Sequence, residues 1–292
     1  MDSTAKSYRE TLYCPLGKPF EICDPGELDP IVEHLQQNAL ISEPQVFPRG
    51  THLPDGRLDL CKQSIGPLGT EKVASAAGGN LHTRHLLLGA NGMGSEGAKA
   101  VAQAVRQSKT LETVYLGCNL IEEPGAVSLA DAVQQSNTVN ALWLKRNPIG
   151  QEGAFRLAEM LGCSQTLRTL DLVQCGLSSQ GLRAIVDAVT RPQTSLRRLY
   201  LGGNRIKPAD VELIAELLRV NRSLHSLYLS VNQLGDEGAS ILASALGENQ
   251  TLQVLGLASN AIGDVGASAL AAATARHPKL QNVDLGYDKS TR

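Results

Sequence analysis

Residues 224–238 read LHSLYLSVNQLGDEG, and this stretch contains the pattern that decides the fold. Leucine occupies its first, fourth, sixth and eleventh positions, and Asn232 occupies the ninth. The alternation of leucines with other side chains predicts a short strand that buries one face. The residues after this strand predict a loop, and Gly238 is expected to open a helix.

The same pattern recurs from residue 58 to the C-terminus. The position of Asn232 is filled at intervals of 28 residues, with a single interval of 29. These positions hold Gln63, Asn91, Asn119, Asn147, Cys175, Asn204, Asn232, Asn260 and Asp288. Such a fixed period is typical of a solenoid, in which each unit contacts only its neighbours. We expect the repeated side chain to hydrogen-bond backbone groups where each strand ends, and the extra residue to lie in the loop at 191–193.

Each unit predicts a strand, a loop with glycine, a helix and a return loop. Apolar residues at helical spacing, such as Val101, Ala102 and Val105, give each helix one buried face. Strands joined by helices pair in parallel, and because a helix is about 10 Å wide while strands lie about 4.8 Å apart, stacking bends the array. The sequence predicts an α/β fold: a right-handed, horseshoe-shaped solenoid with a parallel β-sheet on the concave face and α-helices on the convex face.

These features resemble leucine-rich repeats of the ribonuclease-inhibitor type over about four-fifths of the chain. The resemblance rests on the 28-residue unit, the L-x-x-L-x-L-x-x-N-x-I strand and the G-x-x-G-A helix start. This class includes ribonuclease inhibitor, the sensor regions of NOD-like receptors and the Ran GTPase-activating protein. The resemblance implies a scaffold that binds a ligand more often than an enzyme, and it transfers no partner-contacting residue to this chain.

The segment before the repeats is expected to be a cap, with a separate small functional domain as the alternative. Residues 1–52 do not fit the period, and prolines divide them into short pieces. One helix is predicted from Asp29 as N-cap, with Pro30 in its first turn. Residues 53–292 are expected to form a leucine-rich repeat domain of about eight to nine strand-helix units. The chain ends on a polar strand, which caps the array, leaves an edge open to weak dimerisation, or marks a truncation.

Composition disfavours several classes of function. A net charge of -2 and a pI near 6.3 give no global attraction for nucleic acid or anionic lipid. The sequence shows no signal segment and no membrane span of roughly 20 apolar residues, so we expect a soluble, cytoplasmic protein, or alternatively an effector delivered into another cell. Six scattered cysteines without a CxxC pair predict reduced thiols, although Cys14 and Cys23 are able to pair if the protein is exported.

One side chain of each strand faces the concave surface, because side chains alternate along a strand. These positions hold Asp59, Leu87, Tyr115, Trp143, Asp171, Tyr200, Tyr228, Gly256 and Asp284. Since neighbouring members are about 5 Å apart, the aromatic residues are expected to form two exposed pairs that flank Asp171. Clustered aromatic residues dominate protein interfaces, so these residues and Asp171 are the central candidates for partner contact. The alternative is that Tyr and Trp merely suit exposed strands.

A basic cluster is expected beside these aromatic residues. It consists of Lys145, Arg146, Arg168, Arg197 and Arg198. The cluster either steers an acidic partner or forms an ordinary solvated surface.

Other motifs carry weaker signals. Residues 92–97 match the G-x-G-x-x-G dinucleotide fingerprint, but two of these glycines recur as turn residues in other repeats, and so we expect no cofactor. His82 and His85 stand at a strand start with a spacing that places them on opposite faces, which disfavours a metal site. No catalytic constellation of Ser, His and Asp, or of Cys and His, follows from the spacing.

The leading hypothesis is a non-enzymatic scaffold that binds a protein of unknown identity on its concave face. A GTPase-activating protein resembling the Ran activator is the alternative from another class, although the acidic C-terminal tail that this resemblance implies is missing. A third hypothesis is an effector or immune-sensor recognition module, for which the chain offers no attached signalling, nucleotide-binding or ubiquitin-ligase domain.

Overall fold

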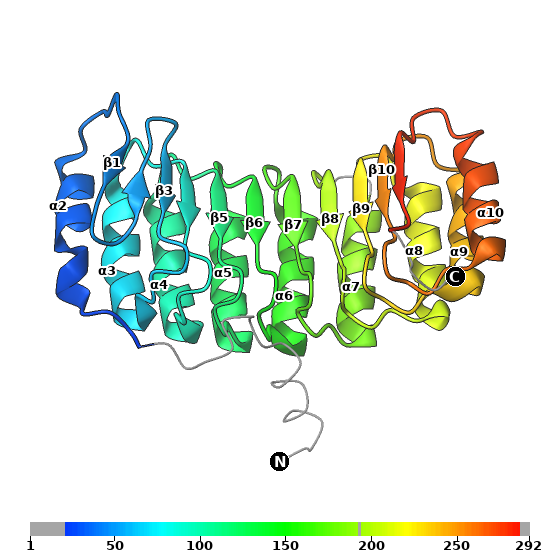
Figure 1. Cartoon of the computed structure of the whole chain (residues 1–292), viewed down its shortest axis with the longest axis horizontal. Coiled ribbons are helices and arrows are strands. Elements are labelled where there is room, and N and C mark those ends of the chain that lie inside the picture. Colours follow the sequence, from blue (N-terminus) through cyan, green and yellow to red (C-terminus); the bar gives the residue numbers. More distant parts are fainter. Residues whose placement is uncertain (1–20, 192–193, 287–292) are drawn as a thin grey trace, which may run out of the picture.

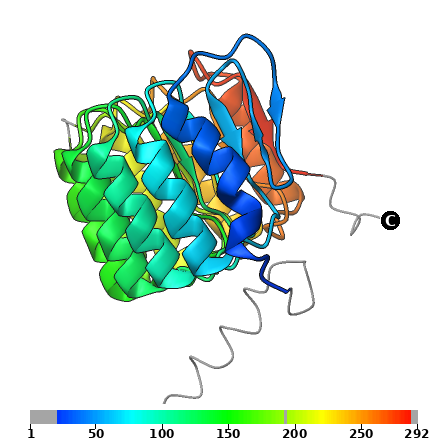
Figure 2. The same cartoon turned by 90° about the vertical axis from the view of Figure 1, so that its left-hand side faces the viewer.

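The computed structural model describes residues 21–191 and 194–286. Here the strands of one sheet follow each other in sequence order, with a row of helices on one side (Figure 1). Seen end on, the middle repeats are displaced toward the helix side relative to both ends, so that the sheet lines the inside of the curve (Figure 2). The predicted α/β solenoid, with its sheet on the concave face, is confirmed.

The elements have the following bounds. The strands are β1 (Gln45–Val46), β2 (Thr51–His52), β3 (Arg57–Asp59), β4 (His85–Leu87), β5 (Thr113–Tyr115), β6 (Ala141–Trp143), β7 (Thr169–Asp171), β8 (Arg198–Tyr200), β9 (Ser226–Tyr228), β10 (Val254–Gly256) and β11 (Asn282–Asp284). The helices are the 3₁₀ helix η1 (Pro25–Leu28) and the α-helices α2 (Asp29–Gln37), α3 (Gly66–Gly79), α4 (Gly94–Gln107), α5 (Glu123–Gln135), α6 (Gly150–Cys163), α7 (Ser179–Thr190), α8 (Pro208–Val220), α9 (Gly235–Leu246) and α10 (Asp264–Thr274).

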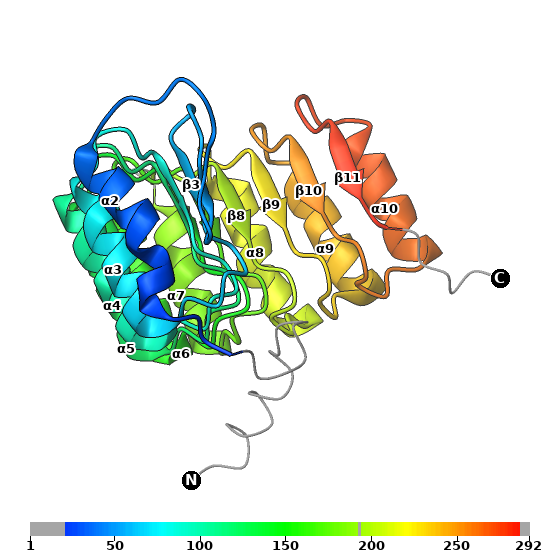
Figure 3. The ribbon, with the colours of Figure 1, turned by 60° about the vertical axis from the view of Figure 1, so that its left-hand side comes forward.

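From β3 to β11 neighbouring strands pair in parallel and in one register, so that Tyr115 lies opposite Trp143 and Tyr200 opposite Tyr228. The first two pairings, β1 with β2 and β2 with β3, are antiparallel. Short connections join these strands, whereas a parallel pair needs a crossover such as a helix. Figure 3 shows α2 and these strands at one end of the array and β11 at the other.

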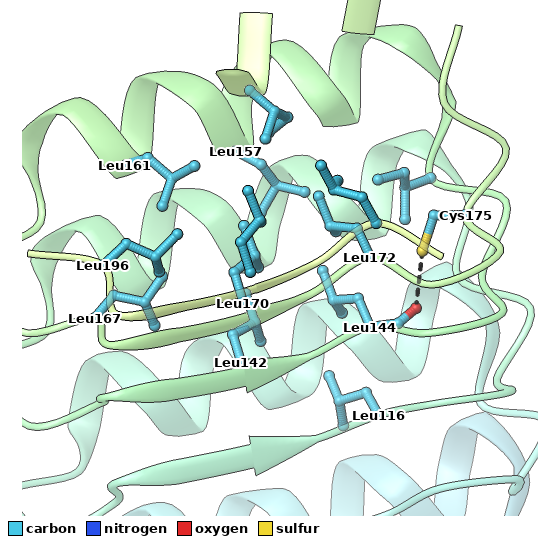
Figure 4. Close-up of a cluster of buried hydrophobic side chains, with 14 of the residues drawn as sticks. Leu116, Leu142, Leu144, Leu157, Leu161, Leu167, Leu170, Leu172, Cys175 and Leu196 are labelled. Atoms are coloured by element: carbon cyan, nitrogen blue, oxygen red, sulfur yellow. Dashed lines mark hydrogen bonds between the residues drawn. The ribbon is translucent and has the colours of Figure 1, made fainter. Parts of the chain in front are cut away.

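Each repeat contributes a thin layer of aliphatic side chains to a shared core. Leu142, Leu144, Leu170 and Leu172 point from the sheet toward the helices, where Leu157 of α6 lies (Figure 4). All five side chains are completely buried. Because the layers are alike, each repeat covers the apolar side of the next.

The repeated asparagines hydrogen-bond backbone groups at the strand ends, as predicted. The Nδ2 group of Asn119 donates to the carbonyl oxygens of Leu88 (2.9 Å) and Leu116 (3.0 Å). Its Oδ1 accepts from the Asn91 N–H at 2.7 Å. Each amide therefore joins its own repeat to the preceding one. The same arrangement is found at Asn147, Asn204 and Asn232. The last predicted member, Asp288, lies outside the described residues.

Cys175 interrupts this asparagine ladder. Its Sγ donates to the Leu144 carbonyl oxygen at 3.2 Å (Figure 4). A thiol is only a weak donor and acceptor, whereas the asparagine amide is a strong donor and a strong acceptor. Burial raises the pKa of the Cys175 thiol well above its usual range, so the side chain serves as a small core residue, as predicted.

A second row of side chains, which the repeat pattern did not reveal, closes the loops from helix to strand. The Oγ of Ser108 accepts from the N–H groups of Thr110 (3.1 Å) and Leu111 (3.0 Å), and so holds the loop in a tight turn. Equivalent acceptors stand at Asn80, Ser136, Ser164, Asn221, Asn249 and His277. In the loop between α7 and β8, the hydroxyl of Thr194 accepts from the Leu196 N–H at 3.4 Å.

The extra residue of the 29-residue interval lies between the end of α7 and the start of β8; the predicted loop at 191–193 falls in this span, but its residues 192–193 lie outside the described residues. In α7, Val189 takes the buried position that Leu161 takes in α6, and it follows Leu161 by 28 residues. Leu196 follows its buried counterpart Leu167 by 29. The loop between Val189 and Leu196 thus absorbs the insertion, and the sheet keeps its register.

The segment before the repeats packs onto the first of them. Leu28 and Leu35 are buried in the same core as the repeats, and the His34 Nε2 atom lies 3.0 Å from the Nδ1 atom of His52 on β2. The predicted helix is present as α2, but Asp29 is its first residue rather than its N-cap. Because η1 runs directly into α2, Leu28 stands at the cap position.

Among the described residues, no helix is long and apolar enough to cross a membrane. The Cys23 thiol is buried and free. Its predicted partner in the case of export, Cys14, lies outside the described residues.

Candidate functional site

Four aromatic side chains form one continuous row across the concave face, hereafter the aromatic row: Tyr115, Trp143, Tyr200 and Tyr228. The ring centroids of Tyr115 and Trp143 are 6.4 Å apart, and those of Trp143 and Tyr200 are 5.3 Å apart. The rings of Tyr200 and Tyr228 stack in parallel at 4.3 Å. All four residues are half-buried. The expected two separate pairs are therefore corrected to a single row.

Asp171 lies beneath this row and is not an exposed anchor. Trp143 and Tyr200 are two strand spacings apart, about 9.6 Å, so their shorter ring separation means that the rings incline toward each other across Asp171. Asp171 is only 3% exposed. Asp171 is predicted as a partner-contact residue, but its short side chain is covered by its longer neighbours. Burial is also the main cause that raises the pKa of Asp171, to about 6.

The carboxylate of Asp171 also has a local structural role. Its Oδ1 accepts from the Val173 N–H at 2.8 Å. The same bond, to the residue two positions later, is made by Asp59 and by Asp284, each at 2.9 Å. An aspartate at this strand position thus turns the chain at the end of the strand, whether or not rings cover it.

Glycines provide room for rings that lie along the sheet. A Cβ atom added to Gly89 would stand 2.4 Å from Cε1 of Tyr115, and one added to Gly256 would stand 2.7 Å from Cδ1 of Tyr228. A larger residue at either position would push the ring away from the sheet. The sequence already indicated this at Gly256, because that glycine occupies the concave position on the strand next to that of Tyr228.

Lys145 extends one end of the row. Its Nζ lies 5.4 Å from the Tyr115 ring centroid, within the range of a cation–π contact. Its partial burial acts to lower the pKa, but the hydrogen bond and charge of Tyr115, together with the charge of Asp171, raise it overall. Lys145 therefore presents a positive charge beside the row at neutral pH.

The basic residues do not form the single cluster that was expected. Lys145 and Arg146 follow β6, whereas Arg168, Arg197 and Arg198 precede or begin β7 and β8. Because the strands are parallel, these groups lie on opposite sides of the aromatic row. The sequence already indicated this separation, because two of the basic residues come after the end of their strand and the other three come before or at the start of theirs.

Most of these arginines bind neighbouring repeats. The Nε of Arg146 donates to Gln174 Oε1 at 2.6 Å. Nη1 of Arg168 donates to the Ser195 carbonyl oxygen at 3.1 Å. Arg198 is exposed, and its charge acts to lower the pKa of Tyr200, which burial and Tyr228 raise to about 12.

The described residues contain no group of three or more His, Cys, Asp or Glu side chains arranged to hold a metal ion. His82 and His85 have separate partners, the Asn38 carbonyl oxygen and the Thr113 hydroxyl. In the G-x-G-x-x-G stretch, Gly92 and Gly94 have positive φ at the turn into α4, and Gly97 packs against Met93 inside the solenoid. The site therefore offers aromatic and cationic groups suited to recognition.

Comparison with known proteins agrees with the repeat structure. A family model described as Leucine Rich repeat matches residues 163–186, 220–243 and 248–271. The chain contains leucine-rich repeats. In this leucine-rich-repeat protein, each matched segment starts at or just after the end of a helix, contains one strand and ends within the next helix.

Two solved structures are similar to this leucine-rich-repeat protein at low sequence identity. "Leiomodin-1 Actin-Binding Site 2 (ABS2)" is 17% identical, with a TM-score of 0.43, and the match covers 47% of this chain and 79% of that one. The tropomodulin C-terminal domain of Caenorhabditis elegans is 18% identical, with a TM-score of 0.39, and the match covers 61% of this chain and 92% of that one. Such likeness carries no conclusion about a partner. The resemblance to NOD-like receptors and the Ran activator stays a prediction. A comparison with curated proteins gives no match.

Proposed function

We propose that this protein is a non-enzymatic scaffold that binds a protein partner on its concave face, with the aromatic row at the centre of the contact. One observation carries the proposal: the chain is only 3% aromatic, yet four of its aromatic side chains touch one another in a row on this face. Large rings on a rigid surface supply contact area at a low cost in conformational entropy.

The solenoid itself does not require these rings. Its core is filled by the leucines on the opposite face of the same strands, such as Leu142 beside Trp143 and Leu199 beside Tyr200. Asp59, Leu87 and Gly256 occupy the same concave position in other repeats without disturbing the sheet. The rings are therefore available for recognition.

The charges around the row favour an acidic partner. Lys145 stands on one side and the exposed Arg198 on the other. The carboxylate between them, Asp171, is buried, and its raised pKa reduces its negative charge toward pH 6. Association is thus expected to weaken as salt concentration rises, since exposed charges are screened.

The test is capture of a partner by the full chain, followed by affinity measurement with both purified proteins. A Trp143→Ala/Tyr200→Ala variant is expected to bind at least about tenfold more weakly. Truncation of an aromatic residue at the centre of an interface commonly costs about 2 kcal/mol of binding free energy or more. A Leu68→Ala/Val265→Ala variant, which removes exposed apolar side chains from α3 and α10, is the matched control. Equal affinity of the wild-type chain and the aromatic variant would show that the partner binds elsewhere.

A further inference from the structure

A hollow of about 360 Å³ lies at the end of the array where the chain enters the repeats. Three segments line it, all of them within the described residues: the loop after α2, the turn between β2 and β3, and the loop between α3 and β4. Hydrogen bonds join these segments. The Leu81 N–H donates to Oδ1 of Asn38 at 2.8 Å, and the N–H groups of Arg84 and His85 donate to the carbonyl oxygen of Gly56 at 2.8 and 3.0 Å. The hollow is therefore a fixed part of the fold.

Two exposed leucines form apolar walls of the hollow. Leu40 is 78% exposed and Leu81 is 55% exposed. Leu81 directly follows the loop-closing side chain of Asn80. Other repeats hold polar residues or proline at this position, namely Lys109, Asn137, Gln165, Arg222, Gln250 and Pro278. The scaffold does not need an apolar side chain here, and neither leucine fills the core, so both are available to contact a ligand.

A buried histidine with one unpaired nitrogen also lines the hollow. His52 is only 1% exposed, and its Nδ1 atom lies 3.0 Å from Nε2 of His34 on α2. The Nε2 atom of His52 itself has no hydrogen-bond partner in the part of the chain that the structure describes. A buried polar atom without a partner is costly, so this nitrogen favours a ligand that hydrogen-bonds it.

The other polar side chains that line the hollow have partners in the protein. Asp55 pairs with Arg57 at 2.8 Å, and Arg84 pairs with Glu112 at 3.2 Å. The Nε2 atom of His82 lies 3.1 Å from the backbone carbonyl oxygen of the C-cap residue of α2. The charges around the hollow are thus compensated, which favours a neutral ligand over an ion.

We propose that this hollow binds a tyrosine side chain of a protein partner. The phenol ring is an apolar body that can pack against Leu40 and Leu81, and its hydroxyl both donates and accepts hydrogen bonds. The hydroxyl therefore suits Nε2 of His52 in either tautomer, whereas an indole N–H only donates and a carboxylate only accepts. Exposed side chains change rotamer readily, so the two leucines can open a path to the buried nitrogen.

The exposed walls favour a side chain of a second protein over a free small molecule. Small-molecule sites enclose most of their ligand, whereas Leu40 and Leu81 are largely exposed. The partner assignment rests on the proposed function. Arg84 on the wall is one strand and three residues away from Tyr115 of the aromatic row, which is roughly 11 Å. One partner is therefore able to reach both places.

The first experiment titrates the full chain with p-cresol, the side-chain analogue of tyrosine, and follows the imidazole nitrogen resonances by NMR. We expect saturable binding that shifts the His52 resonance, and binding about tenfold weaker in Leu40→Gln/Leu81→Gln, which loses both apolar walls. Glutamine stands at the position of Leu81 in other repeats, so this variant is expected to fold. Leu68→Gln/Val265→Gln makes the same change at exposed sites on α3 and α10 and should bind like wild type. No saturable binding, or equal weakening in both variants, overturns the proposal.

The second experiment tests the hydrogen bond with toluene, which has the ring and methyl group of p-cresol without the hydroxyl. The ratio of p-cresol affinity to toluene affinity should be about fivefold higher in wild type than in His52→Phe, because one hydrogen bond is lost. Comparison of ratios cancels the different hydrophobicity of the two probes, and an equal ratio in the two chains overturns the proposal. In wild type, p-cresol but not toluene should move the His52 Nε2 resonance. This comparison needs no variant, and an unmoved resonance also overturns the proposal.

The third experiment separates the two sources of a phenol, with the blocked peptides acetyl-Gly-Tyr-Gly-amide and acetyl-Gly-Phe-Gly-amide as probes. Tighter binding of the tyrosine peptide, weakened in Leu40→Gln/Leu81→Gln, supports the partner assignment. Binding of p-cresol without binding of the tyrosine peptide indicates a small-molecule site and overturns it. The Trp143→Ala/Tyr200→Ala variant is expected to keep its p-cresol affinity. Failure of p-cresol binding therefore rejects the hollow alone, and failure of the aromatic variant to lose its partner rejects the proposed function alone.

Discussion

Trp143 and Tyr200 lie on strands that are separated by β7, yet their ring centroids are 5.3 Å apart and cover the Asp171 carboxyl between them. The two rings thus control the access of water to a titratable group. This relationship links the surface proposed for partner contact to a measurable property of one residue.

Removal of one ring should return the Asp171 pKa toward its ordinary value of 3.8 from about 6. Burial is the main cause of the raised pKa, and Trp143→Ala admits water. An NMR titration of the aspartate carboxyl carbon in wild type and variant measures the change. An unchanged Asp171 pKa would mean that the strand, not the rings, excludes water.

The His34–His52 contact should make stability depend on pH. Burial, with the nearby charges of His34 and His82, lowers the folded-state pKa of His52 from 6.5 to about 4, against the opposing effect of Asp55. The unfolded chain therefore binds the proton first, and His52 contributes stability that falls as pH drops from about 6.5 to about 4, by roughly 1–3 kcal/mol. Asp171 has the opposite sign, because its raised folded-state pKa makes the folded chain bind the proton first as pH falls.

The two contributions are separated by variants studied with urea unfolding between pH 4 and pH 7. His52→Phe should become relatively more stable than wild type toward pH 4, and Asp171→Asn relatively less stable. Because His52 joins β2 to α2, the first variant also tests our proposal that residues 1–52 form a cap on the repeats of residues 53–292. Parallel pH curves for His52→Phe and wild type would contradict the assignment of the His52 proton.

Cys175→Asn should stabilise the protein. An asparagine here can donate to the Leu144 carbonyl oxygen, as the weaker thiol now does, and can accept from the Asn147 N–H, so that the ladder becomes continuous. A gain of about 1 kcal/mol in the free energy of unfolding is expected from one improved and one new hydrogen bond. The reverse change, Asn119→Cys, is the control and should be destabilising, because it removes an amide that makes three such bonds. A loss of stability in Cys175→Asn would indicate a pocket too small for the amide.

Gly256→Ala should displace the Tyr228 ring, since the new Cβ would stand 2.7 Å from a ring carbon. Loss of the stacked contact with Tyr200 is expected to change the near-ultraviolet circular dichroism and to cost about 1 kcal/mol. Gly79→Ala is the matched control, because its Cβ meets no heavy atom within 4 Å and it lies in a helix, where alanine is favoured. The same spectrum for Gly256→Ala and wild type would show that the ring has another place to lie.

The period of 28 residues was enough to predict the solenoid, the asparagine ladder and the strand position of every ring, because all three depend on counting along the chain. It did not predict that the rings of Trp143 and Tyr200 meet. Ring inclination depends on the size of the residue between them, Asp171, and on three-dimensional packing that a one-dimensional period does not encode.

The basic residues show a different kind of miss. Lys145 and Arg198 both lie close in sequence to a residue of the aromatic row, and this closeness suggested a single cluster. Lys145 stands two residues after Trp143, whereas Arg198 stands two before Tyr200, which in parallel strands means opposite sides of the row. The loop-closing side chains, such as Ser108 and Asn221, were missed because serine and asparagine at a loop look like ordinary polar residues until their hydrogen bonds are seen.

The insertion between Val189 and Leu196 leaves the pairing of Asp171 with Tyr200 intact. The length of a loop from helix to strand is therefore independent of the register of the sheet in this array. Residues can be added to such a loop without a change in the concave face. An engineer who wished to graft a second specificity onto the protein would begin at this loop, where the chain already tolerates one residue more than its neighbours.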